Sequence, residues 1–182
     1  MSVHPYTVMT VCTGNICRSP AAEYMLRDVL AHAEDVSGTT VSSAGTAGMT
    51  GYGMDPRSLD YLGVREIDGF GFTARRANRK ILKSSDLVIG LDQSHVDACL
   101  AIDPSALSRT FRLHQLAEWH RNGDLHTLSE LPAVRRSLPP VTGDHEDPIG
   151  FTSAEDYIRV LDGIAADVRE VAALLVPVTA QR

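Results

Sequence analysis

The chain has 182 residues, of which 43% are hydrophobic and 22% charged, a composition typical of soluble globular proteins. This length is enough for one domain with a substantial core, and we expect residues 1–182 to form a single domain. The net charge of −6 argues against binding to nucleic acid or to an anionic membrane surface. Only three cysteines, no apolar run long enough to span a membrane and no evident secretory signal together predict a reducing, cytoplasmic location.

The first half of the chain alternates apolar runs, which predict strands, with amphipathic segments, which predict helices. Tyr6–Val11 is predicted to be a buried strand. Ser19 and Pro20 are predicted to cap and begin a helix that continues to about Ala33. The other elements predicted in this half are a strand at Thr39–Ala44, a helix from Asp55 to Leu62 and a helix at Arg75–Ser84.

The second half begins with the most hydrophobic predicted strand, Asp86–Leu91. The elements predicted after it are a helix over about Asp92–Ala101, an edge strand at Arg109–Leu113, a helix at His114–Arg121 and, in an irregular stretch, a helix near Leu125–Arg136. A capping box at Thr152 and Glu155 predicts the last helix, with an apolar stripe formed by Tyr157, Leu161, Ile164, Val168, Val171 and Leu175. Strands that alternate with helices predict an α/β fold, a parallel sheet covered on both faces.

The segment Val11–Pro20 connects the first predicted strand to the first predicted helix. Ligands of open α/β sheets bind beyond the carboxyl ends of the strands, so Cys12 lies where a site is expected. The N–H groups of residues 13–18 can turn inward around a dianion, assisted by the dipole of the following helix. Arg18 can donate two parallel hydrogen bonds to phosphate oxygens, so the segment predicts a phosphate-binding loop.

The same donors stabilise a thiolate at Cys12, which is the attacking form of cysteine. We therefore predict in-line attack of the Cys12 sulfur on phosphorus, followed by hydrolysis of a cysteinyl-phosphate. A cysteine followed six positions later by arginine also occurs by chance, and free cysteines are mostly inert core residues. Gly14, Asn15, the pair Ser19-Pro20 and the preceding strand favour the catalytic interpretation.

A general acid must protonate the leaving oxygen, and three Asp-Pro pairs are candidates. Asp55-Pro56 is typical of a helix start, and Asp103-Pro104 of a turn or helix start. Asp147-Pro148 lies in a loop rich in glycine and proline, beside further acidic residues. We predict Asp147 as the acid, with Asp144 as the alternative.

The segment Val11–Pro20, with Ala22-Glu23 after it, resembles the low-molecular-weight protein tyrosine phosphatases. Less specific matches follow in the same order, at Ser42–Thr46, Leu91-Asp92 and Asp147-Pro148. Taken loosely, the resemblance covers nearly the whole chain. It implies a three-layer fold, with a four-stranded parallel sheet between helices on both faces.

The resemblance implies that Cys12 is the nucleophile, Arg18 the phosphoryl-binding residue and Asp147 the general acid. The phosphate-binding residues that it implies are Thr13, Gly14, Asn15, Ile16, Cys17, Arg18 and Ser19. Asn15, Ser43 and Asp92 would support the loop, and Cys17 could form a reversible disulfide with Cys12 that a thiol partner reduces. The implied substrates are phosphorylated proteins, above all at tyrosine, or aryl phosphates, with no metal and no cofactor.

Several positions depart from the family pattern. Ile149-Gly150 stand where an aromatic residue usually follows Asp-Pro, and Met49 and Tyr52 are the candidates for the other wall of the substrate slot. Phe72–Arg75 lacks the histidine that usually supports the Asn/Ser network, so Asn15 and Ser43 are expected to be held differently. The stretch 113–147 is longer than expected, which predicts a lid or a partner surface.

Three alternative functions stay open. The first is a phosphate-loop module that binds phosphorylated partners with weak turnover. The second is a protein arginine phosphatase, against which Ile16 argues because that branch carries threonine there. The third is a thiol-dependent arsenate reductase, which needs two further cysteines, whereas only Cys99 lies outside the loop and is predicted to be core.

Neither the histidines nor the basic residues outside the loop form a motif of their own. His114, His120 and His126 are spaced too widely for one helix face and are predicted to lie on the surface or to cap helices. The basic residues Arg75, Arg76, Arg79 and Lys80 are predicted to form a solvated helix face, with a docking patch for acidic phosphopeptides as the alternative.

Overall fold

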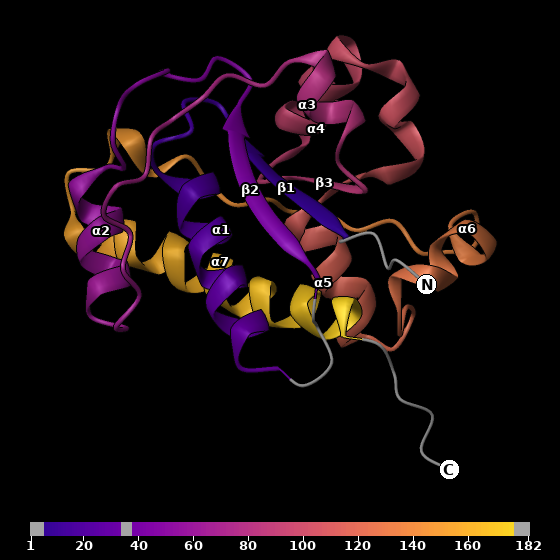
Figure 1. Ribbon diagram of the computed structural model, residues 1–182. Helices are drawn as coiled ribbons and strands as arrows, with labels where there is room; N and C mark the ends of the chain where they lie inside the picture. Colours follow the sequence, from indigo (N-terminus) through magenta and orange to yellow (C-terminus); the bar gives the residue numbers. More distant parts are fainter. Residues whose placement is uncertain (1–5, 34–37, 177–182) are drawn as a thin grey trace.

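A computed structural model describes residues 6–33 and 38–176 (Figure 1). Its strands are β1 (Thr7–Cys12), β2 (Thr40–Gly45), β3 (Leu87–Gly90) and β4 (Thr110–Arg112). Its helices are α1 (Arg18–Ala31), α2 (Pro56–Gly63), α3 (Arg79–Lys83), α4 (Gln93–Ile102), α5 (Leu113–Arg121), α6 (Leu131–Val134) and α7 (Ala154–Leu175). Short 3-10 turns lie at η1 (Pro104–Arg109), η2 (Leu128–Glu130) and η3 (Pro148–Gly150).

The four strands form one parallel sheet in the order β2-β1-β3-β4, as predicted. Val8 of β1 is aligned with Val41 of β2 on one side and with Leu87 of β3 on the other. From β1 the chain first adds β2 at one edge and then returns to add β3 at the opposite edge. Because ligands bind where the strand order changes direction, the carboxyl ends of β1 and β3 define the expected site.

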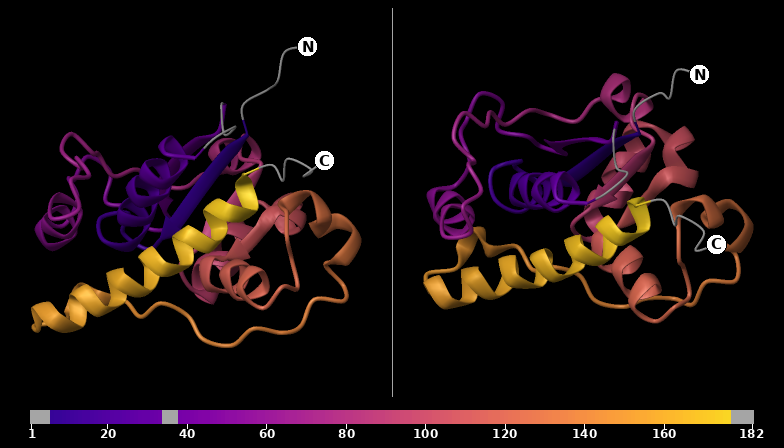
Figure 2. Two further views of the ribbon diagram at one scale, coloured as in Figure 1. Left: turned by 90° about the horizontal axis from the view of Figure 1, so that it is seen from below. Right: turned by 60° about the horizontal axis from the view of Figure 1, so that its bottom comes forward.

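Successive residues of β1 point to opposite faces of the sheet, and each face is covered by helices (Figures 1 and 2). Val8 and Cys12 belong to the larger apolar cluster, which includes residues of α1, α5 and α7. Met9 and Val11 belong to the smaller one, with Leu82 of α3 and Cys99 of α4. The molecule therefore has three layers, and Cys99 is a core residue, as predicted.

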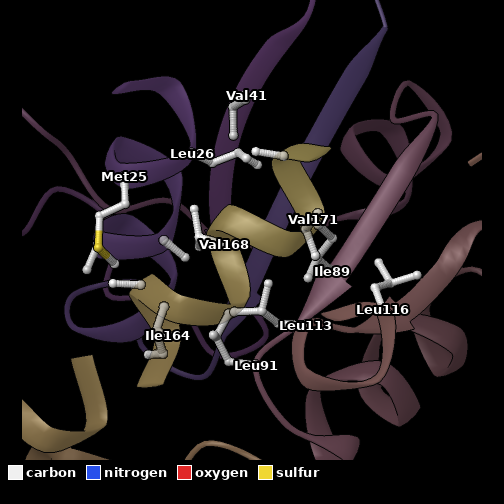
Figure 3. Packing of buried hydrophobic residues seen from close by; sticks show 14 of the residues in the cluster. Met25, Leu26, Val41, Ile89, Leu91, Leu113, Leu116, Ile164, Val168 and Val171 are labelled. Atoms are coloured by element: carbon white, nitrogen blue, oxygen red, sulfur yellow. The ribbon is translucent and has the colours of Figure 1, made fainter. Parts of the chain in front are cut away.

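The long helix α7 lies across the larger face and packs between α1 and α5. Its predicted apolar stripe is buried, including Tyr157, which is 1% exposed, except for Leu175, which is partly buried. Figure 3 shows Ile164 and Val168 near Met25 of α1, and Val171 near Leu116 of α5. Burial of each such side chain stabilises the fold by roughly 1.5–3 kcal/mol, so α7 fixes the helical layer beneath the sheet.

The helix start predicted at Asp55-Pro56 is confirmed, since Asp55 caps α2 by accepting the N–H of Arg57. Two other predicted caps are displaced by one or two residues. Helix α1 begins at Arg18 with Cys17 at its N-cap, not Ser19, because the Ser19 hydroxyl is directed toward Cys12. Helix α7 begins after Ser153, whose hydroxyl accepts the N–H of Asp156, so the predicted box of Thr152 and Glu155 is wrong.

The predicted helix at Arg75–Ser84 is also wrong in its first half. Asn78 caps α3 by accepting the N–H of Ile81, which delays the helix to Arg79. Before it, Arg76 pairs with Gly45 in an isolated parallel bridge. The segment around Arg75 therefore runs along the end of β2 instead of forming a basic helix face.

The long stretch 113–147 does not form a lid. After α5 it turns through η2 and α6, and the Trp119 indole N–H donates to the Pro139 carbonyl at 2.8 Å. Leu125 and Leu131 are buried in the main core, so the predicted helix near Leu125–Arg136 is two short turns that pack there. Among the described helices, none is long and apolar enough to cross a membrane.

Candidate active site

The loop between β1 and α1 turns its carbonyl groups toward the neighbouring chain. The carbonyl oxygens of residues 12–14 and 16 accept hydrogen bonds of 2.7 to 3.0 Å from N–H groups of residues 46–55. In the part of the chain that the structure describes, no protein acceptor pairs with the N–H groups of residues 13–17. Asn15 has a φ of 57°, a left-handed conformation that asparagine tolerates better than most residues. The loop thus offers a ring of free amide donors, which suits a tetrahedral oxyanion.

Strand β2 approaches this loop so closely that only glycine fits at its end. A Cβ on Gly45 would lie 2.4 Å from the Thr13 carbonyl oxygen and 2.9 Å from the Asn15 nitrogen. The match of Ser42–Thr46 to the family therefore has a steric explanation at Gly45, where any side chain would collide with the phosphate loop.

A chain of hydrogen bonds leads to the sulfur of Cys12. The Asn15 amide nitrogen donates to the hydroxyl oxygens of Ser19 at 2.9 Å and Ser43 at 2.8 Å. The Ser19 oxygen lies 3.0 Å from the Cys12 sulfur. Ser19 accepts from Asn15, so its own hydrogen can be donated either to the sulfur or to the Ala44 carbonyl, which lies 3.4 Å away. Donated to the sulfur, it would stabilise a thiolate.

The orientation of the Asn15 amide is fixed by Arg75 in place of the expected histidine. The Arg75 N–H donates to the Asn15 carbonyl oxygen at 2.9 Å, and the Arg75 Nε donates to the Ser43 carbonyl at 2.8 Å. Phe72 lies elsewhere and packs edge-on against Tyr24. Sequence reasoning missed this role of Arg75, because the contact runs through the backbone and leaves no side-chain signal.

Behind Ser43 the network ends at a buried acid. The Ser43 hydroxyl donates to Glu23 at 2.5 Å, and Arg27 pairs with the same carboxylate group at 2.6 Å. Burial raises the pKa of Glu23, while the Ser43 and Arg27 contacts oppose that rise. The sequence points to Glu23 only through the family resemblance, although a Glu on the buried side of a helix itself indicates a polar network.

Arg18 connects the loop to two other parts of the chain. Its Nη1 lies 3.0 Å from Asp92 Oδ2 and donates to the His145 carbonyl at 2.8 Å. Its Nη2 lies 3.1 Å from Asp147 Oδ2. Arg18 is only 2% exposed, so its guanidinium is held in one place at the base of the site.

Asp92 follows β3 and caps α4 together with His95. The Asp92 side chain accepts the N–H of His95, and the Asp92 N–H donates to His95 Nδ1 at 3.1 Å. Burial raises the pKa of Asp92, but hydrogen bonds from Ser94 and the positive charge of Arg18 outweigh it and hold the pKa below its usual value. The other ring nitrogen of His95 lies 3.0 Å from the Thr13 hydroxyl, so the cap also supports the phosphate loop.

The two candidate acids occupy different places. The Asp147 side chain is 47% exposed, contacts Arg18 and accepts the N–H of Ile149 at 3.2 Å. Asp144 instead pairs with Arg112 at 2.8 Å and accepts the N–H of Gln93 at 3.2 Å. The structure thus brings Asp147, and not Asp144, next to Arg18.

These residues enclose a cavity of about 170 Å³. Its lining residues are Cys12, Thr13, Gly14, Ile16, Cys17, Arg18, Met49, Asp147 and Ile149. Met49 and Ile149 are 40% and 50% exposed at its rim, whereas Tyr52 is 61% exposed and is not part of the wall. No residue of the stretch 113–146 lines the cavity.

The three cysteines have different surroundings, and all are free. Burial raises the pKa of the Cys17 thiol to about 12, and its sulfur lies 3.7 Å from an oxygen of Asp55. Burial also raises the pKa of Cys99 to about 11, on the opposite face of the sheet. Both thiols stay protonated at neutral pH and are poor nucleophiles.

Of the histidines predicted to lie on the surface or to cap helices, His126 is exposed, whereas His114 and His120 are partly buried and pair with acids. His120 pairs with Glu170, and His114 joins His145 and Asp167 in a cluster whose ligand-type atoms lie within 4.8 Å of one another. An arginine, Arg121, occupies the other oxygen of Asp167. No local sequence pattern predicts this cluster, because its members come from three separate segments of the chain.

The family model of the low molecular weight phosphotyrosine protein phosphatases matches residues 7–130. The low molecular weight protein-tyrosine-phosphatase Ptp of Acinetobacter johnsonii is 35% identical over 106 residues, which cover 58% of this chain and 70% of the relative. The phosphatase Etp of Escherichia coli K12 is 30% identical over 124 residues, 68% of this chain and 80% of the relative.

Solved structures show the same fold at lower identity. Wzb of Vibrio vulnificus has a TM-score of 0.69 at 21% identity, covering 92% of this chain and 97% of the other. The YwlE arginine phosphatase of Geobacillus stearothermophilus has a TM-score of 0.73 at 23% identity, covering 92% and 91%. The chain therefore belongs to the low molecular weight phosphotyrosine protein phosphatase family, whose members use a cysteine nucleophile.

Proposed function

We propose that this chain hydrolyses phosphate monoesters, with Cys12 as nucleophile, Arg18 as phosphoryl-binding residue and Asp147 as general acid. The Cys12 thiolate attacks phosphorus, the bond to the leaving oxygen breaks, and that oxygen takes the proton of Asp147. Asp147, now ionised, then removes a proton from water as this water attacks the cysteinyl-phosphate. The products are inorganic phosphate and the restored thiolate, with Asp147 protonated again.

One observation carries this proposal: Cys12, Arg18, Asp147 and four loop residues whose amides have no protein acceptor all line one small cavity. These four residues are Thr13, Gly14, Ile16 and Cys17. Fixed donors around the equatorial oxygens stabilise the charged transition state of phosphoryl transfer. The Asn15, Ser19 and Ser43 contacts hold the loop and direct a hydroxyl at the Cys12 sulfur. The supporting residues predicted from the sequence, including Asp92, fit this role.

The pairing of Asp147 with Arg18 explains how the acid would be prepared. A bound phosphoryl dianion accepts two parallel hydrogen bonds from an arginine. Because Asp92 and the His145 carbonyl already occupy Nη1 of Arg18, the dianion competes with Asp147 for Nη2. Displaced from Arg18 and placed beside the negative phosphoryl oxygens, the carboxyl group favours its protonated form. Substrate binding itself would therefore convert Asp147 into a proton donor.

The cavity walls favour an aromatic substrate over other phosphorylated residues. Ile16, Met49 and Ile149 form an apolar rim, and Arg18 and Asp147 are the charged residues of the lining. We therefore infer phosphotyrosine in proteins as the substrate class, in line with the names of the relatives. Phosphoarginine, a guanidinium ligand, would find no polar partner on the wall formed by Ile16.

The position of Cys99 bears on the arsenate-reductase alternative. Arsenate reduction is disfavoured, because Cys99 is fully buried on the other face of the sheet and cannot relay a disulfide. A reversible Cys12–Cys17 disulfide, a thiol reductant and a cytoplasmic location stay predictions. Helices cover both faces of one sheet, which supports the prediction that the chain forms a single domain.

Rapid-quench kinetics with p-nitrophenyl phosphate test the proposal. We expect a burst of nitrophenol equal to the enzyme concentration, and a trapped peptide containing residue 12 with one added PO3 group. Cys12→Ser should lower turnover by roughly 10⁴-fold or more, because an alcohol is a far weaker nucleophile than a thiolate. Cys99→Ser is the matched control and should keep the wild-type rate.

Turnover retained in Cys12→Ser would overturn the proposal. A binding module would show phosphate-competitive ligand binding and no burst.

A further inference from the structure

A side-chain cluster outside the cavity, built around a buried carboxylate, anchors the loop that carries Asp147. We call it the histidine clamp, formed by His114 of α5, His145 of the loop and Asp167 of α7. His114 Nδ1 and His145 Nε2 lie 2.8 Å and 2.9 Å from the same oxygen, Oδ2 of Asp167. The other oxygen of Asp167 accepts from Arg121 at 2.9 Å. The Asp167 side chain is 5% exposed and has three donors around it.

The direction of these hydrogen bonds follows from the ionisation of Asp167. Burial raises its pKa, but hydrogen bonds from His145, Arg121 and His114 outweigh burial and hold the pKa at about 2. An ionised carboxylate can only accept, so both imidazole nitrogens donate their protons to it. These protons and the Arg121 cation occupy the positions that a metal ion would need, which favours a hydrogen-bonded clamp over a metal site.

The backbone of His145 connects the clamp to the catalytic residues. Its carbonyl accepts from Arg18 Nη1 at 2.8 Å, and its N–H donates to the Leu91 carbonyl at 3.4 Å. Two residues later, Asp147 contacts Nη2 of the same guanidinium. His145 is therefore tied through its side chain to α7 and through its backbone to the phosphate-binding arginine.

Helix α7 leaves room for the imidazole at Gly163. A Cβ at Gly163 would lie 3.4 Å from two atoms of the His145 ring, so the ring packs directly on the helix backbone. After His145 the loop has only exposed polar contacts before Asp147, such as Glu146 with Arg159 at 3.6 Å, each side chain 63% exposed. His145, whose side chain is 10% exposed, is thus the last largely buried polar anchor before the acid. Figure 2 shows the extended segment that precedes α7.

We propose that Asp167, acting through His145, is a positioning residue for Asp147. The inference rests on the proposed function of Asp147 as the general acid. Without the clamp the loop would move relative to the leaving oxygen, and small displacements of a catalytic group cost large factors in rate. Arg18 would keep its contact with Asp92, so phosphate binding should change little.

The test compares substrates that differ in how much they need the acid. Phenyl phosphate releases a phenol with a pKa of about 10, which leaves poorly without protonation. 2,4-Dinitrophenyl phosphate releases a much more acidic phenol that leaves unaided. The quantity to measure is kcat/KM, since it reports the step in which the leaving group departs.

We expect His145→Ala to lower kcat/KM for phenyl phosphate by about tenfold and for dinitrophenyl phosphate by less than about threefold. His145→Gln keeps an N–H that can reach Asp167, so it should recover most of the loss. Asp167→Ala should resemble His145→Ala if it folds, and the two His145 variants decide the question if it does not. Asp147→Asn sets the scale, with a selective loss of roughly 10²-fold.

The matched control is Glu170→Gln. The Glu170 carboxylate also accepts from a histidine of α5, His120, at 2.6 Å. It lies 3.8 Å from Nε of Arg121 but contacts no residue of the loop. The control should leave the ratio of the two substrates unchanged. Equal losses on both substrates in His145→Ala, or no loss, would overturn the positioning role, provided that Asp147→Asn remains selective.

Two further outcomes separate this inference from others. An unselective Asp147→Asn would instead remove the proposed function on which the inference rests. A substrate ratio of the wild type that changes with a chelator would overturn the hydrogen-bonded clamp in favour of a metal site.

Discussion

Two loops meet at the cavity, and they are held in opposite ways. The phosphate loop, residues 13–19, is fixed by backbone contacts from residues 46–55 and by the hydroxyl network of Ser19 and Ser43. The acid loop, residues 141–149, is fixed by long side chains from distant elements. Arg112 donates to the Gly143 carbonyl and to Asp144, and Asp167 holds His145.

The difference matches what each loop must do. The phosphate loop has to present fixed donors to a charged transition state, and its Arg18 is 2% exposed. The acid must reach a leaving group that belongs to a protein surface, and Asp147 is 47% exposed. A residue that stays accessible to a large substrate cannot be packed from all sides, so its loop is anchored from behind.

Among the contacts between the two loops, those of Arg18 are expected to matter most, because its side chain binds the His145 carbonyl and Asp147 of the acid loop. Arg18→Lys should lower kcat/KM for p-nitrophenyl phosphate by roughly 10³-fold, because a lysine is a point charge that cannot pair with two phosphate oxygens. It would also lose the contacts to Asp92 and to the His145 carbonyl. Inhibition by inorganic phosphate should weaken in parallel.

Arg65→Lys serves as the control, since Arg65 pairs with Asp162 away from the cavity. A rate for Arg18→Lys within about threefold of the wild type would mean that the amide ring alone binds the phosphoryl group.

The two loops also differ in how well the sequence predicts them. The phosphate loop is contiguous, and its residue types and the flanking strand and helix specify its conformation locally, so its members could be predicted. Its outer supports at Glu23 and Arg75 were missed, because one lies inside a helix and the other acts through its backbone. The prediction of Ser19 as a helix cap is also wrong, because the same hydroxyl can cap a helix or interact with the sulfur of Cys12, and the sequence does not distinguish the two.

For the acid loop, the sequence predicts the acid itself but not the residues that hold the loop. Asp147 could be singled out among three Asp-Pro pairs because its neighbourhood is irregular and acidic. Its anchors could not, since His145 and Asp167 are 22 residues apart and His114 is 53 residues from Asp167. Only the packing of α5 against α7 brings them together, and no periodic pattern in the sequence encodes that meeting.

A smaller loss of activity is expected when a side-chain hydrogen bond that supports only the phosphate loop is removed. Ser43→Ala removes one acceptor of Asn15 and the donor to Glu23, which leaves a buried carboxylate poorly satisfied. We expect a loss of about 1–3 kcal/mol in the free energy of unfolding and about tenfold in kcat/KM. Urea unfolding and steady-state kinetics measure the two quantities.

The loss in Ser43→Ala should be the same for phenyl and dinitrophenyl phosphate, because the acid loop is untouched. Ser42→Ala, one residue away on β2 with only a Met9 sulfur as side-chain partner at 3.9 Å, is the matched control. A loss in Ser43→Ala confined to phenyl phosphate would show that the two loops are not independent.

The smallest effect at neutral pH is expected at His95, where the phosphate loop is supported by the start of α4. Burial lowers the pKa of His95 to about 4, against the opposing charge of Asp92. The unfolded chain binds a proton below about pH 6.5. Between these two values the unfolded state holds more protons than the folded state, so the free energy of unfolding falls as the pH falls from 6.5 to 4. The full difference corresponds to roughly 3 kcal/mol.

His95→Gln should remove this part of the acid sensitivity, so its free energy of unfolding should fall less than that of the wild type between pH 7 and pH 4.5. Because the Asp92 N–H donates to Nδ1, the neutral ring carries its proton on Nε2 and donates it to the Thr13 hydroxyl. Equal acid sensitivity in His95→Gln and the wild type would mean that the ring is protonated in the folded state, and the bond from the Asp92 N–H could then not exist.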